Sequence, residues 1–244
     1  MMNSTIVGDN YTLYVSLPIF YDDAMGGFPL VVGLDGDIEF SRMRDIVVDG
    51  WGKGTMPAVV FVAIGYGSDE ANNEKRNRDY TPTATVGIED TETGGAENFY
   101  LFIRDELIPE LESRYRIDST KGKTLMGHSY GGLFTFYAMF QERASNPFNR
   151  FIPVATSFWY DSGSIFESEE AYAQTHTDFD ARVYTTMGSL EGGVMLASFA
   201  EMNERLEGRA YPSLSFYHEL LPKYGHSRSD YISYERGLAY VLNP

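Results

Sequence analysis

The strongest constraint on the fold is a turn of small residues, Gly-His-Ser-Tyr-Gly-Gly at residues 127–132. The stretch 123–126 before it is typical of a short strand, and the stretch 133–140 after it is apolar on almost every side. A helix that is apolar all round belongs in a protein interior. Glycines on both sides of Ser129 leave room for a sharp strand-to-helix turn, which lifts the residue at its apex away from the backbone. We therefore expect a buried strand–turn–helix unit with Ser129 at its apex.

Strand-like and helix-like patterns alternate along the rest of the chain. Residues 58–64 form a continuous apolar run, which is typical of a strand buried on both faces of a parallel sheet. The expected strands are 11–17, 28–34, 58–64, 123–126, 151–155, 182–187 and 214–220, and the expected helices are 40–48, 97–116, 133–140, 195–206 and 231–241. This alternation predicts an α/β fold, a mostly parallel sheet covered by helices on both faces.

Three local features refine this pattern. Pro109 should bend the helix 97–116, and Gly208 should end the helix 195–206. The polar stretch 69–95 is interpreted as a long loop. Because no linker or repeat divides the chain, residues 1–244 are expected to form one domain.

The composition excludes several classes of function. The 244 residues carry a formal net charge of −16, which disfavours nucleic acid and anionic membranes as partners. Cysteine is absent, so disulfides, thiolate nucleophiles and Cys-ligated metal centres are excluded. No apolar run approaches the roughly 20 residues that span a bilayer, and residues 1–5 do not begin a signal peptide. A cytoplasmic protein is expected, unless a leader segment has been removed.

Ser129 requires a base, because a serine hydroxyl is a poor nucleophile near neutral pH. In enzymes that carry this type of turn, an acid and then a histidine follow the serine along the chain. His226 fits, because it follows the last expected strand on a glycine-containing loop. His128 should point away from the site, His176 belongs to a polar stretch, and His218 lies within the last strand. We predict Ser129 as nucleophile and His226 as general base.

Glu191 is the expected acid. It stands in the glycine-containing loop 188–193 at the end of a strand, where a carboxylate can reach a histidine on the next strand's loop. The alternative is a glutamate that stabilises the start of a helix through the helix dipole. Asp161, Asp178 and Asp180, in neighbouring loops, are competitors for this role.

Two backbone N–H groups are expected to stabilise the oxyanion of a tetrahedral intermediate. One belongs to Tyr130, which follows the nucleophile at the start of a helix. The other belongs to Asp37, or less favourably to Gly36, in the turn after the strand 28–34. Gly36 would allow close backbone approach. The alternative is a plain Asp-Gly turn.

Several segments match a known superfamily in order. They are residues 11–18, Leu-Asp-Gly-Asp at 34–37, residues 63–66, Arg-Asp-Tyr-Thr-Pro at 78–82, residues 102–109, the turn at 127–132, and Ser-Phe-Trp-Tyr-Asp at 157–161. Together they cover nearly the whole chain. In this combination the chain resembles the esterase D superfamily of α/β-hydrolases, most closely its enterochelin-esterase and IroE-type branch.

The resemblance implies an α/β-hydrolase fold and hydrolysis of carboxylic esters through an acyl-serine intermediate, with no metal or cofactor. By position it implies Ser129 as nucleophile, His226 as base, Glu191 as acid, and Asp37 and Tyr130 as oxyanion donors. Some relatives work with a Ser–His pair alone, which makes Glu191 the least secure of the three side chains.

The substrate site is expected along residues 158–180. Trp159 and Tyr160 offer aromatic surface to an acyl or aryl group, although aromatic residues in such a segment can equally fill the core. Arg78 is the candidate for a substrate carboxylate or phenolate, since a guanidinium binds such groups in bidentate fashion. A structural pair between Arg78 and Asp79 is the alternative.

The sequence favours a serine carboxylesterase that acts on small acyl or aryl esters. The alternative is a siderophore trilactone esterase, although a net charge of −16 suits a ferric tricatecholate poorly. An acyltransferase and a non-catalytic binding module on the same fold rank lower. The expected partners are a small-molecule ester and, in a homo-oligomer, further copies of the chain.

Overall fold

An eight-stranded sheet forms the centre of the molecule. The computed structural model describes residues 1–67, 69–85 and 91–243. The strand order is β1-β2-β4-β3-β5-β6-β7-β8, and neighbours from β4 to β8 are parallel, whereas β1 and β2 are antiparallel. The strands are β1 (Met2–Asn3), β2 (Asn10–Ser16), β3 (Leu30–Gly33), β4 (Val60–Gly65), β5 (Lys123–His128), β6 (Arg150–Val154), β7 (Ala181–Gly188) and β8 (Leu214–Leu221).

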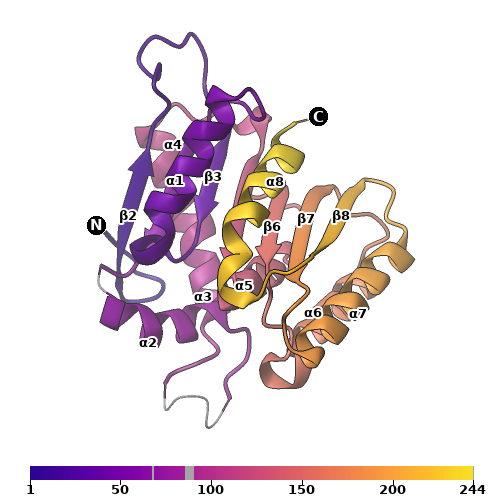
Figure 1. The fold of residues 1–244 in the computed structure, drawn as a ribbon. Coiled ribbons are helices and arrows are strands. Elements are labelled where there is room, and N and C mark those ends of the chain that lie inside the picture. Colours follow the sequence, from indigo (N-terminus) through magenta and orange to yellow (C-terminus); the bar gives the residue numbers. More distant parts are fainter. Residues whose placement is uncertain (68, 86–90, 244) are drawn as a thin grey trace.

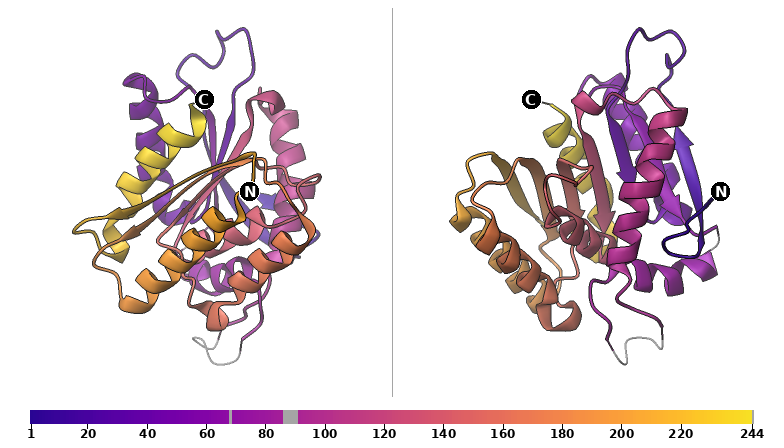
Figure 2. Two further views of the ribbon diagram at one scale, coloured as in Figure 1. Left: turned by 90° about the vertical axis from the view of Figure 1, so that its right-hand side faces the viewer. Right: turned by 180° about the vertical axis from the view of Figure 1, so that it is seen from behind.

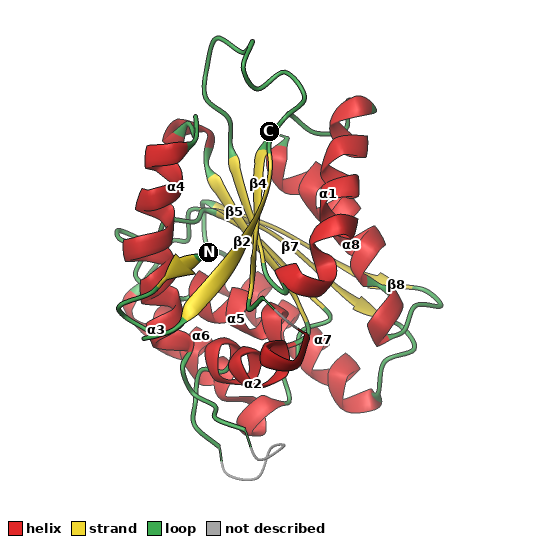
Figure 3. Cartoon of the chain, turned by 90° about the vertical axis from the view of Figure 1, so that its left-hand side faces the viewer, coloured by secondary structure: helices red, strands yellow, loops and turns green. Residues whose placement is uncertain are grey.

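Helices cover both faces of this sheet (Figures 1 and 2). Helices α1 and α8 lie together on one face, and α3, α4 and α5 lie on the other (Figure 3). The α-helices are α1 (Gly36–Gly52), α2 (Asp69–Tyr80), α3 (Ala96–Leu101), α4 (Ile108–Arg114), α5 (Tyr130–Met139), α6 (Ser164–Thr175), α7 (Gly193–Arg209) and α8 (Asp230–Leu242). A π-helix, η1 (Phe102–Leu107), joins α3 to α4, and short 3₁₀ turns occur at η2 (Ser119–Lys121), η3 (Tyr160–Gly163) and η4 (His226–Arg228).

The predicted α/β architecture is confirmed. All six residues of β4 are buried, as the continuous apolar run predicted, because helices pack on both sides of this central strand. Helix α5 buries eight of its residues, in agreement with its all-round apolar sequence. The candidate residues Ser129, Glu191 and His226 all follow strands at the carboxyl ends of the parallel sheet, the edge at which such sheets bind ligands.

The stretch 69–95 was wrongly interpreted as loop throughout. Helix α2 occupies Asp69–Tyr80, and its sequence is too polar for apolar periodicity to reveal it. Tertiary contacts fix the carboxyl-terminal end of α2, since Tyr80 is completely buried and its hydroxyl accepts a hydrogen bond from the amide of Asp35 at 3.1 Å. Residues 86–90 of the expected loop lie outside the described residues.

Two predicted helices differ in detail from the structure. The helix 97–116 contains the π-helix η1 directly before Pro109, with the amide of Ile108 donating to the carbonyl of Ile103, five residues back. Helix α7 does not stop at Gly208 but continues to Arg209, and Ala210 caps it in a left-handed conformation with φ 50°. The segment 158–180, along which the substrate site is expected, contains α6.

Candidate active site

Ser129 occupies a strained turn between β5 and α5. Its backbone angles are φ 61° and ψ −116°, which only a sterically enforced turn holds for a residue with a side chain. A Cβ atom on Gly127 would stand 2.4 Å from the carbonyl oxygen of Gly131, and one on Gly132 would stand 2.8 Å from that of Val154. The two glycines therefore allow the tight approach, and the turn raises the hydroxyl of Ser129 above the sheet.

His226 and Glu191 are joined directly. The Nδ1 atom of His226 lies 2.9 Å from Oε2 of Glu191, whose side chain is 2% exposed against 41% for the imidazole. The loops that carry them are held together by the backbone, since the amide of Leu190 donates to the carbonyl of Tyr224 at 2.8 Å. Gly188 permits this approach, because a Cβ atom there would lie 2.4 Å from the same carbonyl oxygen.

The competing acids have other partners. Asp178 accepts hydrogen bonds from the amide and the hydroxyl of Ser213, and Asp161 accepts one from the hydroxyl of Thr83. Neither they nor Asp180 contact His226 by a hydrogen bond or ion pair in the described residues. The geometry therefore singles out one carboxylate for the histidine.

The hydroxyl of Ser129 has a neighbour that the sequence did not suggest. Its Oγ lies 3.2 Å from Oγ of Ser157, a buried residue on the loop after β6, and either oxygen can donate. Within the described residues, Ser129 and His226 make no direct hydrogen bond. In enzymes without substrate such bonds are often long, and they tighten when substrate is bound.

The two expected oxyanion donors stand at adjacent helix starts. Asp37 lies in the first turn of α1, and Tyr130 is the first residue of α5, where N–H groups lack acceptors within the helix. A Cβ atom on Gly131 would lie 3.4 Å from Oδ2 of Asp35, so the two helix starts are neighbours. The carboxylate of Asp37 itself is turned to the end of β4, where it accepts from the amide of Gly67 at 2.9 Å.

Arg76 is a site residue that sequence reasoning missed. Its Nε and Nη2 bind the two carboxylate oxygens of Asp35 at 2.7 and 3.1 Å, and Nη2 also donates to the carbonyl of His128 at 3.1 Å. The guanidinium stacks over the rings of Tyr80 and Tyr130. Burial opposes its charge, but Asp35 outweighs burial and raises the pKa of Arg76. It lies on α2, the helix without a periodic signal.

Arg78, predicted to bind substrate, has structural partners instead. Its Nε lies 2.7 Å from the carboxylate of Asp79, and its Nη1 lies 3.3 Å from that of Asp9. Asp79 is fully buried and accepts a further hydrogen bond from the hydroxyl of Tyr11 at 2.7 Å. These contacts favour the alternative, a structural anchor between α2 and β2.

The two aromatic candidates differ in exposure. Tyr160 is completely buried, and its hydroxyl donates to the carbonyl of Thr83 at 2.6 Å, so its assignment to the substrate is corrected to a packing role. Trp159 is 43% exposed and lies 5.9 Å from the ring of Tyr130, between ring centroids. Only Trp159 of the pair presents aromatic surface beside the turn.

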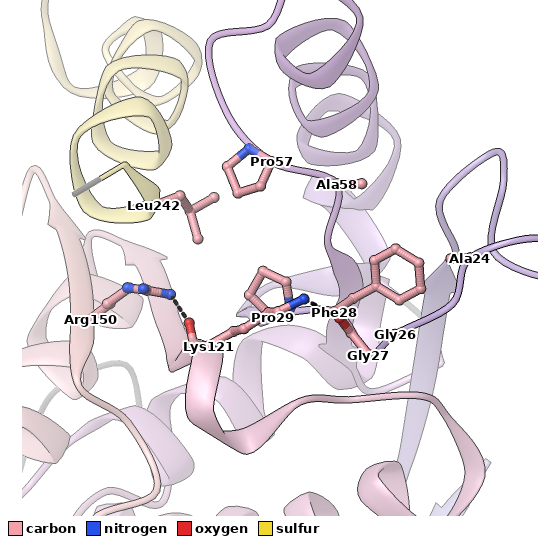
Figure 4. A pocket seen from close by; sticks show the side chains of 10 residues that line it. All are labelled: Ala24, Gly26, Gly27, Phe28, Pro29, Pro57, Ala58, Lys121, Arg150 and Leu242. Carbon is pink, nitrogen blue, oxygen red and sulfur yellow. Dashed lines mark hydrogen bonds between the residues drawn. The ribbon is translucent and has the colours of Figure 1, made fainter.

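A cavity elsewhere in the molecule contains none of the candidate residues. It has a volume of about 460 Å³ and lies at the amino-terminal ends of the parallel strands, between Pro29, Pro57, Arg150 and Leu242 (Figure 4).

The described residues include no group of three or more His, Asp or Glu side chains placed to hold a metal ion. Among the same residues, no helix combines the length and apolar character that crossing a bilayer requires.

The sheet, the serine at a strand-to-helix turn and the acid–histidine pair at the following strands define an α/β-hydrolase. The chain belongs to the family described as "Putative esterase", whose model matches residues 4–231.

Two curated relatives illustrate the family. The chain is 37% identical to the ferri-bacillibactin esterase BesA of Bacillus subtilis (strain 168) over 151 residues, which are 57% of this chain and 51% of that protein. It is 31% identical to the apo-salmochelin esterase of Escherichia coli O6:H1 over 133 residues, 51% of this chain and 41% of that protein. The matches thus span about half the length of these relatives or less.

Solved structures match over nearly the whole chain. The BES protein from Bacillus cereus has a TM-score of 0.86 at 29% identity, covering 100% of this chain and 93% of that one. An IroE-like serine hydrolase from Shewanella oneidensis has a TM-score of 0.85 at 25% identity, covering 98% of this chain and 78% of that one.

Proposed function

We propose that this chain hydrolyses the ester bonds of a siderophore, with Ser129, His226 and Glu191 as the catalytic residues. The observation that carries the proposal is the Glu191–His226 hydrogen bond at the same sheet edge as the strained Ser129 turn, in a chain similar to siderophore esterases. Of the two functions favoured by the sequence, the relatives support the siderophore esterase over the general carboxylesterase.

The proposed reaction uses these residues in the following steps. The hydroxyl of Ser129 attacks the ester carbonyl while Nε2 of His226 takes its proton, and Glu191 holds the Nδ1–H of the resulting imidazolium. The amides of Asp37 and Tyr130 stabilise the oxyanion. Collapse of the intermediate releases the alcohol, which receives the proton from His226. His226 then takes a proton from water, which attacks the acyl-serine. Collapse of this second intermediate releases the carboxylic acid and returns the proton to Oγ of Ser129.

Two cationic residues flank His226 in the sequence. Lys223 and Arg228 lie on either side of His226 on the same loop, and both are exposed. In the part of the chain that the structure describes, neither side chain makes an ion pair or hydrogen bond. Two cations without ion-pair partners on the base loop favour an anionic substrate there. An anionic siderophore is therefore compatible with this loop, although the whole chain carries a net charge of −16.

The test compares two substrates in wild type and Ser129→Ala. Enterobactin, a catecholate trilactone, is followed by chromatography of its linear products, and p-nitrophenyl butyrate is followed by absorbance. We expect wild type to open the trilactone with the larger kcat/KM, and Ser129→Ala to lose both activities while keeping its melting temperature. The melting temperature should hold because the hydroxyl of Ser129 is partly exposed and adds little to the core.

The outcomes separate substrate from mechanism. An inert trilactone beside active turnover of p-nitrophenyl butyrate would refute the siderophore assignment and leave a general carboxylesterase. Equal rates in wild type and Ser129→Ala would refute the nucleophile, whichever substrate is used.

A further inference from the structure

We propose that His128 is a positioning residue that holds the base loop against the nucleophile turn. Its Nε2 lies 2.8 Å from the carbonyl oxygen of His226, and the two imidazole rings are 4.7 Å apart between centroids. The residues are 98 positions apart in the sequence. This inference rests on the proposed roles of Ser129 and His226 and assigns His128 a task that the turn motif does not specify.

The partner atom fixes the protonation of His128. A carbonyl oxygen only accepts, so Nε2 must carry the hydrogen. Burial lowers the pKa of His128, and the imidazole of His226 lowers it further. The hydrogen bond to the backbone of His226 and the charges of Asp230 and Asp35 act in the opposite direction without reversing the shift. Arg76 adds a positive charge at the backbone of His128, since its Nη2 donates to that carbonyl. His128 therefore stays neutral and remains an Nε2–H donor while the adjacent base gains and loses a proton.

The bond joins the turn that carries the nucleophile to the loop that carries the base. His128 immediately precedes Ser129, so a single peptide unit separates the nucleophile from the residue that holds the base loop. Glu191 orients the imidazole of His226, whereas His128 binds the backbone carbonyl of His226. The hydroxyl of Ser229 also donates to this carbonyl, but over a longer distance of 3.4 Å. Because Ser129 and His226 are not directly bonded, the approach of base to nucleophile depends on this contact.

The sequence predicts that His128 points away from the site as a packing or hydrogen-bonding residue, and these two roles respond differently to substitution. A packing residue would be replaceable by any side chain of similar volume. A positioning residue is replaceable only by a donor with similar reach. Glutamine extends an N–H donor to a comparable distance, whereas leucine fills similar space without a donor.

The experiment compares His128→Leu and His128→Gln with p-nitrophenyl butyrate, and His218→Gln serves as the control. His218 lies on β8 with its Nε2 3.0 Å from Glu207 and is 37% exposed. We expect His128→Leu to lower kcat about 10- to 100-fold, the effect of a small misplacement of reacting groups, with KM nearly unchanged. His128→Gln should restore most of kcat, and His218→Gln should resemble wild type.

Combining His128→Leu with Glu191→Gln provides a second measurement. Since both residues act on His226, the double variant should lose less kcat than the product of the two single losses.

The inference is overturned if folded His128→Leu keeps the wild-type kcat, or if His128→Leu and His128→Gln lose kcat equally. Failure of the proposed nucleophile is seen separately, as activity in Ser129→Ala. If His128→Leu does not fold, the kcat of folded His128→Gln decides: a value near wild type supports the inference, and a loss of about tenfold or more refutes it.

Discussion

Replacing Glu191 with glutamine tests whether the site operates as a triad or as a Ser–His pair. The carboxylate is 2.9 Å from Nδ1 of His226, and its side chain is 2% exposed, so water screens it little on its own side. Glutamine keeps the shape and one acceptor oxygen but removes the charge. The change therefore isolates the electrostatic contribution of Glu191 to the imidazolium that forms when Ser129 loses its proton.

The expected loss is about 100-fold in kcat. A hydrogen bond to a charged group contributes about 1.5–3 kcal/mol, which corresponds to roughly 10- to 150-fold in rate. Coulomb attraction between unit charges about 4 Å apart at an effective dielectric constant of about 20 is worth roughly 4 kcal/mol, or about 1000-fold. The imidazole is 41% exposed, so solvent screening brings the value toward the lower figure.

The assay is steady-state hydrolysis of p-nitrophenyl butyrate, with KM expected to change little because the charge develops only in the transition state. Asp178→Asn is the matched control, since it removes an acid that the sequence placed in competition but that bonds to Ser213. A kcat for Glu191→Gln within about threefold of wild type would refute the reasoning, because that is less than about 1 kcal/mol. The site would then work as a Ser–His pair.

Two further changes test other parts of the site, and a third tests the pH dependence of stability. Ser157→Ala should lower kcat/KM about 2- to 10-fold, the value of one neutral hydrogen bond to Oγ of Ser129, and an unchanged value would remove Ser157 from the site. Lys223→Gln with Arg228→Gln should raise KM for ferric enterobactin more than for p-nitrophenyl butyrate, a difference that should shrink in high salt; equal shifts would contradict local charge selection. Burial raises the pKa of Glu39 to about 7, so the folded state holds its proton more tightly and stability should fall as pH rises from about 4.5 to about 7. Urea titrations across that range should show a smaller slope for Glu39→Gln, and an equal slope would assign the pH dependence elsewhere.

The parts of the fold that the sequence predicted are those with local signals. Residues 58–64 predict a central strand, because a strand that is buried on both faces requires an unbroken apolar run. The turn at 127–132 can also be recognised from the sequence, since close contacts in this strand–turn–helix unit require its glycines. Helix α2 was missed because its polar sequence has no apolar stripe and its position depends on Tyr80, which packs against Phe99 and Phe134 from other elements.

The candidate site was predictable where chain order carries information. The order of acid and base after Ser129 pointed to Glu191 and His226, and the structure brings those two side chains together. The roles of Arg76 and Tyr160 could not be predicted, because both depend on contacts with distant segments. Arg76 binds Asp35 beside the serine turn, and Tyr160 is buried with its hydroxyl bonded to Thr83. A sequence identifies residue types capable of chemistry, but exposure and pairing arise only when elements meet.

The position of the base depends on loop contacts more than on the sheet. Strand β8 lies at the end of the strand order and pairs only with β7 among the described strands, so the sheet holds the His226 loop from one side. The other constraints include the backbone bond between Leu190 and Tyr224, the Glu191 carboxylate and the His128 donor. Each contact contributes little to global stability, yet together they set the distance between base and nucleophile. Substitutions in these loops should therefore change kcat before they change the melting temperature, because rate responds to small misplacements that stability tolerates.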